Sequence, residues 1–324
     1  VAANGEETET VAPTPAARQR QQRRLEKAQQ RMEALQTRNG NKRASKRKGR
    51  ERVVVSLSDP EAALGLDKEK VFRPLYNVQV VDDLDSPFVL AYEVFAQPSD
   101  AGLLSTMLPR AKRLLGQALT TLLGDTSYAG GADLAVAEAE KVCVYAPLPG
   151  EGKKGHKQIP KSQFVWLEQA QTYVCPQGHR LHNEGSSVQK RSGTEAVHLT
   201  RYRCPPAHCQ GCPLQARCTP NPQAGRTISR GEHEGLIEAL RERLQTAQAK
   251  QLYRLRSQTV ELVNADWKQH RKLRRFSGRG LKRVRCQVAL TVLAHNLVTL
   301  LAEEKKAAQR KAKDNAGNPA EVAT

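Results

Sequence analysis

The first half of the sequence alternates between strand-forming and helix-forming stretches, and this order leaves few folds open. Residues 76–97 form two β-rich runs around the polar turn "DLDSP", which indicates a hairpin. Two helices should follow, with Asp100 as the N-cap of the first and Pro109 as the break between them. An apolar strand in 118–130 then ends at Asp125, and a further helix and strand complete the order β-β-α-α-β-α-β. We therefore predict an α/β sheet covered by helices.

A segment rich in Gly, Pro, His and Cys interrupts this pattern over residues 147–232, where we expect short strands at most. Five of the seven cysteines lie between residues 175 and 218. Two cysteines at x2 spacing with others a few residues away indicate a tetrahedral zinc site. The first choice of ligands is Cys204, Cys209, Cys212 and Cys218. Cys175 in place of Cys204 is the second choice, and reduced thiols without metal are the alternative. Four sulfur ligands would make the zinc structural.

Strong helical periodicity returns from Gly235 to Leu301, ahead of a polar tail. The predicted organisation has five parts. These are a disordered start, basic helix and arm (1–52), the first part of the α/β domain (53–146), the Cys-rich insertion (147–232), the helices that complete the domain (233–302) and a disordered tail (303–324).

The N-terminal part is strongly basic. Residues 18–52 contain 14 Lys or Arg and three Glu. We predict disorder over residues 1–17, a basic helix over 16–37 that ends near Gly40, and then a flexible basic arm. A solvated linker and a phosphate-contacting arm fit these charges equally well.

The whole chain has a net charge of +19, which points to a polyanionic partner, nucleic acid first and anionic membrane second. No apolar run approaches the roughly 20 residues that span a membrane, and the start of the chain does not resemble a signal peptide. The clustered cysteines are typical of a reducing compartment. We therefore expect a cytoplasmic protein that binds nucleic acid.

Glu261 is a candidate functional acid, because it precedes a run of cations. Nine Lys or Arg and no acid lie between Lys268 and Arg285. If residues 252–268 form one helix, Glu261 lies opposite its apolar arc, with Arg254 and Lys268 beside it. The alternative is a solvated helix face with weak ion pairs.

Asp125 is the second candidate, since the carboxyl end of an apolar strand is where open α/β sheets place their sites. The alternative is an Asp that only forms the turn "GDTS". Carboxylates from two distant segments fit a divalent-metal site for Mg²⁺ or Mn²⁺. Two such ions about 4 Å apart can hold the attacking and leaving oxygens of a phosphodiester.

Several short motifs in this order resemble the C-terminal catalytic part of a bacterial insertion-sequence transposase of the DDE type, which has an RNase H-like fold. The resemblance covers roughly residues 50–302. The motifs are "SDPEA" (58–62), "YNVQVVD" (76–82), "GDTSY" (124–128), "CPQGH" (175–179), the Cys cluster, "TVELVNADWK" (259–268) and "HNL" (295–297).

The resemblance implies an RNase H-like mixed sheet flanked by helices, with the zinc-ribbon-like insertion before the last helices. In the family two aspartates and a glutamate bind the metal ions, and Asp125 and Glu261 match the second aspartate and the glutamate. Lys268 matches a lysine seven residues after that glutamate. A related subset has Tyr and Arg seven and four residues before it. Here Arg254 and Ser257 take those positions, and Tyr253 and Arg256, each one position away, are the alternative equivalents.

The first aspartate of the family has no equivalent here. Asp59, Asp82 and Asp83 do not match it, and the resemblance places it before Val1. We therefore expect an N-terminally truncated transposase that lacks the family's N-terminal DNA-binding region and is inactive as this fragment.

As a transposase, the chain would cleave a DNA strand with metal and join the freed 3′-OH to target DNA. Lys268 and Arg254 would contact phosphate near the cleaved bond. Further backbone contacts would come from Arg271, Lys272, Arg274, Arg275, Lys282 and Arg283. The partners would be double-stranded DNA at the element ends and the target and, by analogy, a second copy of the chain, in a nucleoid-associated cytoplasmic setting.

The main alternative is a catalytically inactive DNA-binding remnant or a zinc-bearing regulatory protein. A basic RNA-binding protein accounts for the charge, but not for Asp125, Glu261 and the Cys cluster together.

Overall fold

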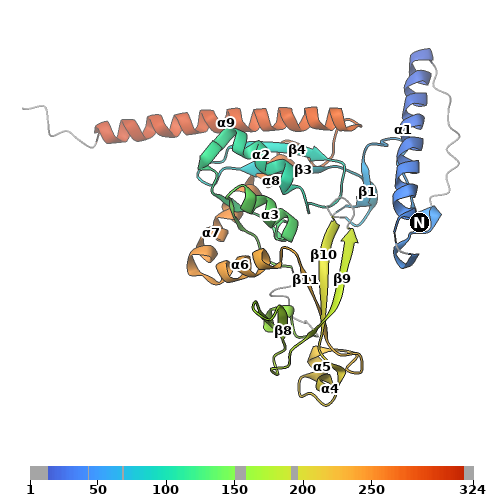
Figure 1. Ribbon diagram of the computed structural model, residues 1–324. Helices are drawn as coiled ribbons and strands as arrows, with labels where there is room; N and C mark the ends of the chain where they lie inside the picture. Colours follow the sequence, from blue (N-terminus) through green and yellow to red (C-terminus); the bar gives the residue numbers. More distant parts are fainter. Residues whose placement is uncertain (1–13, 43, 68, 150–157, 191–195, 317–324) are drawn as a thin grey trace, which may run out of the picture. The chain divides into compact units, whose positions relative to one another are not determined.

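A computed structural model divides the chain into two compact units (Figure 1). Unit 1 comprises Val1–Asp100 and Ser257–Thr324, and unit 2 comprises Ala101–Arg256. These boundaries cut across those predicted at residues 146 and 232. The residues that the structure describes are 14–42, 44–67, 69–149, 158–190 and 196–316.

Unit 1 opens with α1 (Pro15–Gly40), which confirms the predicted basic helix. The disorder predicted over residues 1–17 is wrong for 15–17, where α1 has already begun, and residues 1–13 lie outside the described part of the chain. Two antiparallel hairpins follow. They are formed by β1 (Ala63–Leu66) with β2 (Phe72–Leu75), and by β3 (Asn77–Asp82) with β4 (Val89–Phe95). The second is the predicted hairpin, and the first was not predicted. Short 3-10 turns occupy η1 (Ala44–Lys46) and η2 (Arg50–Arg52).

Two C-terminal helices complete unit 1, namely α8 (Val260–Gln269) and α9 (Leu281–Ala316). They cover the β3–β4 hairpin and bury an apolar core between them (Figure 1). The buried members of this core are Val89, Val94, Val263, Trp267, Val284, Val288 and Val292. We call this cluster the hairpin core.

Residues of "SDPEA" hold the start of α9. Asp59 is buried, and its carboxylate accepts hydrogen bonds from the Tyr76 hydroxyl at 2.9 Å and the Gly280 amide at 3.0 Å. Glu61 accepts a bond of 2.7 Å from the Leu281 amide. Carboxylates placed there satisfy amides that the first turn of a helix leaves without a partner. The motif therefore has a structural role.

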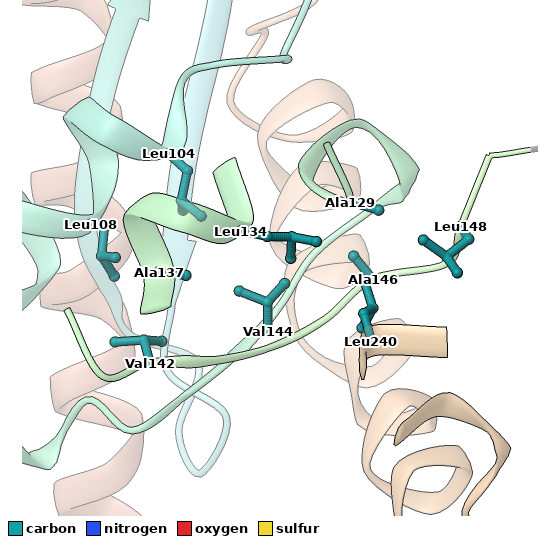
Figure 2. Close-up of a cluster of buried hydrophobic side chains, with 10 residues drawn as sticks. All are labelled: Leu104, Leu108, Ala129, Leu134, Ala137, Val142, Val144, Ala146, Leu148 and Leu240. Atoms are coloured by element: carbon teal, nitrogen blue, oxygen red, sulfur yellow. The ribbon is translucent and has the colours of Figure 1, made fainter. Parts of the chain in front are cut away.

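Unit 2 contains the predicted strand–helix–strand crossover. The strands β5 (Thr121–Leu123) and β6 (Cys143–Tyr145) pair in parallel, and α3 (Gly131–Ala139) connects them. Helices α2 (Leu104–Leu115) and α6 (Glu234–Gln245) pack against α3. Buried side chains of these helices, of β6 and of the adjoining segments, all of them Leu, Val or Ala, form the aliphatic core of Figure 2. Two 3-10 turns flank β5, η3 (Gly116–Ala118) and η4 (Thr126–Tyr128).

Two predictions for α2 are wrong. Asp100 does not cap it, because its carboxylate accepts hydrogen bonds from the side-chain amides of Asn77 and Gln79. Instead, the buried carboxylate of Asp133 accepts hydrogen bonds from the backbone amides of Gly102 and Leu104, at 2.9 and 3.2 Å. Pro109 does not break the helix. It costs one backbone hydrogen bond, and the buried face of α2 on both sides of it offsets that cost.

The Cys-rich region contains longer strands than predicted. An antiparallel sheet joins β9 (His182–Lys190), β10 (Ala196–Arg203) and β11 (Thr227–Gly231). A small hairpin precedes it, with β7 (Val165–Leu167) and β8 (Thr172–Val174). The short helical elements are η5 (Lys161–Gln163), α4 (Pro206–Cys209) and α5 (Gln215–Cys218).

The predicted continuous helix over residues 252–268 is wrong. It divides at Thr259, whose φ and ψ of −117° and −94° are not helical, into α7 (Ala247–Gln258) and α8. Arg254 therefore lies on α7 in unit 2, whereas Glu261 and Lys268 lie on α8 in unit 1. The expected flanking of Glu261 by two cations on one helix face holds for Lys268 alone.

The tail predicted to be disordered from residue 303 is helical as far as Ala316, because α9 continues. By length and composition, Leu281–Ala312 is also apolar enough to cross a membrane, contrary to the expectation that no segment is. A third of the apolar window in that helix is nevertheless buried in the protein. The side chains of His295 and Asn296 in the window bond to the backbone of Pro87 and Val89.

Candidate metal and DNA site

Asp125 lies two residues beyond β5 and caps the turn η4. Its carboxylate oxygen Oδ1 accepts a hydrogen bond of 2.8 Å from the Ser127 amide. The residue is half-buried, and its other carboxylate oxygen, Oδ2, takes no part in this bond. The preceding Gly124 is buried, and its amide donates to the Tyr145 carbonyl at 2.9 Å. A Cβ on Gly124 would lie 3.1 Å from the Tyr128 ring. The turn that carries Asp125 is thus fixed by tight packing.

Helix α7 is tied to this turn. The Tyr253 hydroxyl donates a 3.2 Å hydrogen bond to the Gly124 carbonyl, next to Asp125. Sequence reasoning gave Tyr253 no role beyond its place one position away from the tyrosine of a family signature. The structure shows that it contacts the strand end that carries the acid.

Glu261 stands in the first turn of α8, and its residue is exposed. Lys268 follows seven residues later on the same helix, almost two full turns, so both side chains leave α8 on one side. A carboxylate at a helix N-terminus is favoured by the positive end of the helix dipole. Val263 and Trp267, which are buried in the hairpin core, hold the opposite side of α8.

The C-terminal end of α8 has a polar cluster that the sequence did not reveal. Arg271 donates to the Asp266 carboxylate at 2.7 Å, and His295 Nδ1 lies 3.5 Å from the same oxygen. Burial alone would raise the pKa of Asp266. The bonds from Arg271 and His295 outweigh it and bring that pKa below its usual value. Arg271, predicted to contact DNA, is therefore engaged in an ion pair.

The loop between α8 and α9 and the first turn of α9 carry the remaining predicted DNA-contacting cations. Lys272, Arg274 and Arg275 lie in this loop, Lys282 and Arg283 lie in the first turn of α9, and all five residues are exposed. Leu273 and Phe276 of the same loop pack on the hairpin core. The apolar residues of the loop therefore anchor it to the hairpin core, while its cations face solvent.

Four thiols of the Cys-rich region contribute to one core, and Cys212 of the predicted ligand set is not among them. Cys204 and Cys209 are buried in a core with Tyr173, Tyr202 and Phe164, and Cys175 and Cys218 pack against it. We call this cluster the Cys-rich core. Burial raises the pKa of the Cys204 thiol, and hydrogen bonds with Cys209 and Cys175 raise it further. Burial also raises the pKa of Cys218, whose neighbours include Cys209, Cys175 and Cys212.

Backbone contacts that sequence reasoning missed hold these thiols together. Arg226 donates to the carbonyls of Cys218 and Ile159, each at 3.0 Å. Gly225 has φ +78°, and a Cβ there would lie 2.1 Å from the Cys204 carbonyl oxygen, so no other residue fits. Cys175 starts the tight turn "CPQGH", in which Gly178 has φ +83°.

Asp82 is a buried acid at the end of β3. Both carboxylate oxygens are inaccessible, and within the described ranges they accept no hydrogen bond, although the residue as a whole is half-buried. Burial raises the pKa of Asp82 to about 7. A register shift of the hairpin lies between Val81 and Asp82.

The described residues contain no group of three or more His, Cys, Asp or Glu side chains already arranged to hold a metal ion. Asp125 and Glu261 belong to different units. The chemistry of the donors still fits the predicted metals. Carboxylate oxygens suit a hard divalent cation, and thiols suit zinc.

Residues 174–301, about two fifths of the chain, match the family model of the transposase DDE domain. The match confirms the resemblance of the chain to a DDE-type transposase, and it includes the Cys cluster, Glu261 and Lys268. Comparisons with curated proteins and with solved structures gave no match.

Proposed function

We propose that this chain is part of a transposase that cleaves and joins DNA strands, and that Asp125 and Glu261 hold its divalent metal. The observation that carries the proposal is the family match across Glu261 and Lys268. DNA transposition with a divalent metal is the general chemistry of that family.

The route of the chain also supports a shared site. Tyr253 contacts the carbonyl of Gly124, beside Asp125, and Glu261 follows Tyr253 by only eight residues. The covalent path from the Asp125 turn to Glu261 is therefore short. The antiparallel pair β3–β4 and the parallel pair β5–β6 form separate two-stranded sheets in the two units, and an RNase H-like fold would join pairs of both kinds in one mixed sheet.

Each residue has a distinct role in the proposal. Asp125 and Glu261 supply carboxylate oxygens, and a bound divalent cation supplies Lewis-acid chemistry at a phosphodiester. Lys268, on the same side of α8 as Glu261, binds the phosphate as a point charge. The exposed cations of the α8–α9 loop bind the DNA backbone. This activity belongs in the cytoplasm, at the nucleoid.

Metal binding tests the pair of acids without any need for DNA. Titration of the full chain with Mn²⁺, followed by electron paramagnetic resonance, should show a site that Asp125→Asn and Glu261→Gln each weaken at least tenfold. Glu138→Gln and Glu242→Gln, exposed acids on α3 and α6, are the matched controls and should leave the affinity unchanged. A site that neither catalytic substitution weakens, or that responds to one of them alone, would refute the shared-metal assignment.

DNA binding without cleavage is the second candidate function, favoured by the exposed cations of the α8–α9 loop. Affinity for duplex DNA should fall linearly on a log–log plot against salt. Arg274→Gln with Arg275→Gln should reduce that slope by about 2, because each phosphate contact contributes about 0.9. Arg113→Gln, an exposed cation on α2, is the control. An unchanged slope in the double variant would show that the loop does not contact DNA.

We further propose a structural zinc ion in the Cys-rich core, held by Cys175, Cys204, Cys209 and Cys218. The choice of Cys175 over Cys212 rests on the hydrogen-bonding contact of Cys175 with buried Cys204 and its packing on this core. Metal analysis of protein purified without chelator should give about one zinc per chain. Cys175→Ser should abolish it, and Cys286→Ser, on an exposed position of α9, should not. A zinc content near zero in the unsubstituted chain would end this proposal.

A further inference from the structure

Charge is distributed unevenly around the axis of the long helix α1 (Figure 1). The helix contains seven Lys or Arg and two Glu. At about 100° per residue, six of the cations fall within an arc of about 100°, whereas both glutamates lie more than about 100° from the centre of that arc. We call these six cations the cationic stripe, and they are Arg20, Arg23, Arg24, Lys27, Arg31 and Arg38.

The glutamates of α1 do not neutralise the stripe. Glu26 and Glu33 accept hydrogen bonds from the side-chain amides of Gln22 and Gln29, at 3.1 and 3.2 Å. On a solvated helix, charges of opposite sign pair at this spacing of four residues and stabilise the helix. Within the stripe the same spacing brings two cations together three times, and such pairs weaken a helix. A polyanion bound along the stripe would remove this repulsion.

A different side of α1 packs on the protein. Ala28 is buried, and Met32 and Leu35 on the same side are half-buried. In the stripe only Arg31 is half-buried, and the other five residues are exposed. Among the residues that the structure describes, an acid pairs with Lys27 and with no other member of the stripe. A helix that lies in a membrane surface needs its apolar side for lipid, so this arrangement favours a soluble polyanion.

Glu61 connects the middle of the stripe to the start of α9. Its carboxylate accepts hydrogen bonds from the Lys27 ammonium at 2.8 Å and from the Leu281 amide at 2.7 Å. These two bonds, that of Lys27 first, bring the pKa of Glu61 below its usual value despite partial burial. The exposed cations Lys282 and Arg283 follow Leu281 directly. The stripe is therefore held next to two of the residues predicted to contact DNA.

The length and composition of the stripe fit the phosphates of a DNA duplex. From Arg20 to Arg38 the stripe extends about 27 Å, at about 1.5 Å per residue. A duplex presents one negative charge per about 1.7 Å of its axis. Five of the six cations are Arg, whose planar guanidinium can bind a phosphate through two hydrogen bonds. The other α1 residues in the arc, Ala16 and Ala34, offer no polar group for bases, so the contact should not depend on DNA sequence.

We propose that the cationic stripe of α1 is a second DNA-contacting surface, which binds the phosphate backbone of the same duplex as the cations of the α8–α9 loop and the first turn of α9. Glu61 keeps these two sets of cations adjacent. The inference rests on DNA as the partner in the proposed function, and it does not depend on the metal site.

The salt dependence of binding to a short duplex of arbitrary sequence tests the stripe, with the nuclease-treated full chain. Arg20→Gln with Arg24→Gln should reduce the slope of log affinity against log salt by about 2, because each phosphate contact contributes about 0.9. The reduction should be the same for duplexes of different sequence.

A charge-matched variant separates position from net charge. Addition of Gln22→Arg and Gln29→Arg to that double variant restores both charges at exposed positions on the other side of α1, four residues before Glu26 and Glu33. The slope should stay reduced. A slope that returns to its original value would show that net charge governs binding, and it would overturn the proposal. Circular dichroism checks that each variant keeps its helical content, which Gln supports about as well as Arg.

Combination with the loop variant tests whether both surfaces bind one duplex. Arg274→Gln with Arg275→Gln should lower the slope by about 2, and all four substitutions together by about 4, because contacts with one duplex add. An effect of the α1 pair that appears only in the loop variant would mean that the two surfaces bind separate duplexes, contrary to the proposal. If only the loop pair changes the slope, the stripe is rejected and the proposed function is unaffected. If neither pair changes it, DNA itself is rejected as the partner of both surfaces.

Two other ligands would also contradict the proposal. One is single-stranded RNA, if the chain binds it more tightly than duplex DNA and Arg20→Gln with Arg24→Gln abolishes that preference. The other is an anionic membrane, if the same variant loses sedimentation with vesicles of phosphatidylcholine and phosphatidylglycerol but keeps its affinity for duplex DNA.

Discussion

The two cores of unit 2 are built in different ways. The aliphatic core of Figure 2 takes its side chains from α2, α3, α6 and the segments around them, and its buried members are Leu, Val and Ala. The Cys-rich core takes its buried members from β8, β10, β11, the short helix α4 and loop segments, and combines aromatic rings with thiols. Leu, Val and Ala side chains alone form the first core, whereas aromatic rings and thiols make up much of the second.

This difference indicates what stabilises each core. The aliphatic core contains residues such as Leu108 and Ala146 that are completely buried, so the hydrophobic effect suffices to hold it. In the Cys-rich core Cys204 and Cys209 are buried among aromatic and aliphatic side chains, and Cys175 and Cys218 pack against them. A metal held by such thiols would add its binding free energy to the stability of this core. We therefore expect the two cores to unfold under different conditions.

Removal of metal should produce the largest effect. Chelation with 1,10-phenanthroline should destabilise the Cys-rich core by at least about 5 kcal/mol, because structural zinc contributes about 10–16 kcal/mol in small domains. Hydrogen exchange should then show loss of protection in residues 159–228 and unchanged protection in 119–148. Cys143→Ser, on β6 outside the Cys-rich core, serves as the control. Equal protection of both regions with and without chelator would mean that both cores are held by burial alone.

A cavity should produce the next largest effect, in the aliphatic core. Leu108→Ala removes a fully buried side chain from α2 and should cost about 3 kcal/mol in the free energy of unfolding. Leu114→Ala on the same helix removes a side chain that is mostly exposed, so it should cost no more than about 0.5 kcal/mol. Urea denaturation with and without chelator measures both. A cost for Leu108→Ala that changes with chelator would show that the two cores are not independent.

The regular parts of the fold were the predictable ones. The basic helix α1, the β3–β4 hairpin and the β5–α3–β6 crossover follow from local propensity and periodicity. The cap of α2 was not predictable, because its carboxylate comes from Asp133, about 30 residues away in the sequence. The break at Thr259 was equally hidden, since neither Gly nor Pro marks it.

The sequence indicated which chemical groups the candidate site would use, but not the side-chain contacts around them. Residue types and spacing pointed to Asp125, Glu261 and the cysteines. They did not reveal the Tyr253 contact, the ion pair of Arg271 or the support of the thiols by Arg226, each of which joins residues distant in the sequence or on different elements. Pairings of this kind depend on tertiary packing, which local patterns do not encode.

The hairpin core of unit 1 differs from both cores of unit 2, because the carboxylate of Asp82 is buried at the end of one of its strands. Burial raises the pKa of Asp82 from 3.8 to about 7. The folded state therefore binds a proton that the unfolded state has lost between these values. Stability from this group is complete below about pH 4 and is lost as the pH rises through 7.

Asp82→Asn should remove that part of the pH dependence. The full shift corresponds to about 4 kcal/mol, and we expect about half of it, since the residue is partly exposed. Urea denaturation from pH 4 to pH 8 measures the slope, with Asp85→Asn in the adjoining exposed turn as the control. A slope that survives Asp82→Asn would assign the dependence to another group.

The smallest predicted effect on stability concerns the side-chain contacts that connect the two cores of unit 2. The guanidinium of Arg230 on β11 lies 4.0 Å from the centroid of the Trp166 ring in the Cys-rich core. It also donates to both carboxylate oxygens of Glu238, at 2.7 and 3.2 Å. Glu238 is on α6, which supplies Leu240 to the aliphatic core. Arg230 is thus a polar link from one core to the helix that serves the other.

Arg230→Lys keeps the charge and loses both the planar stacking and the bidentate pair, so it should cost about 1 kcal/mol. Arg201→Lys, an exposed arginine on β10, should cost almost nothing. The informative measurement is hydrogen exchange of α6 in chelator. In the unsubstituted chain, opening of the Cys-rich core should loosen α6 through this link, and Arg230→Lys should reduce that loosening. Equal exchange of α6 in both proteins would show that the two cores communicate through the backbone rather than through Arg230.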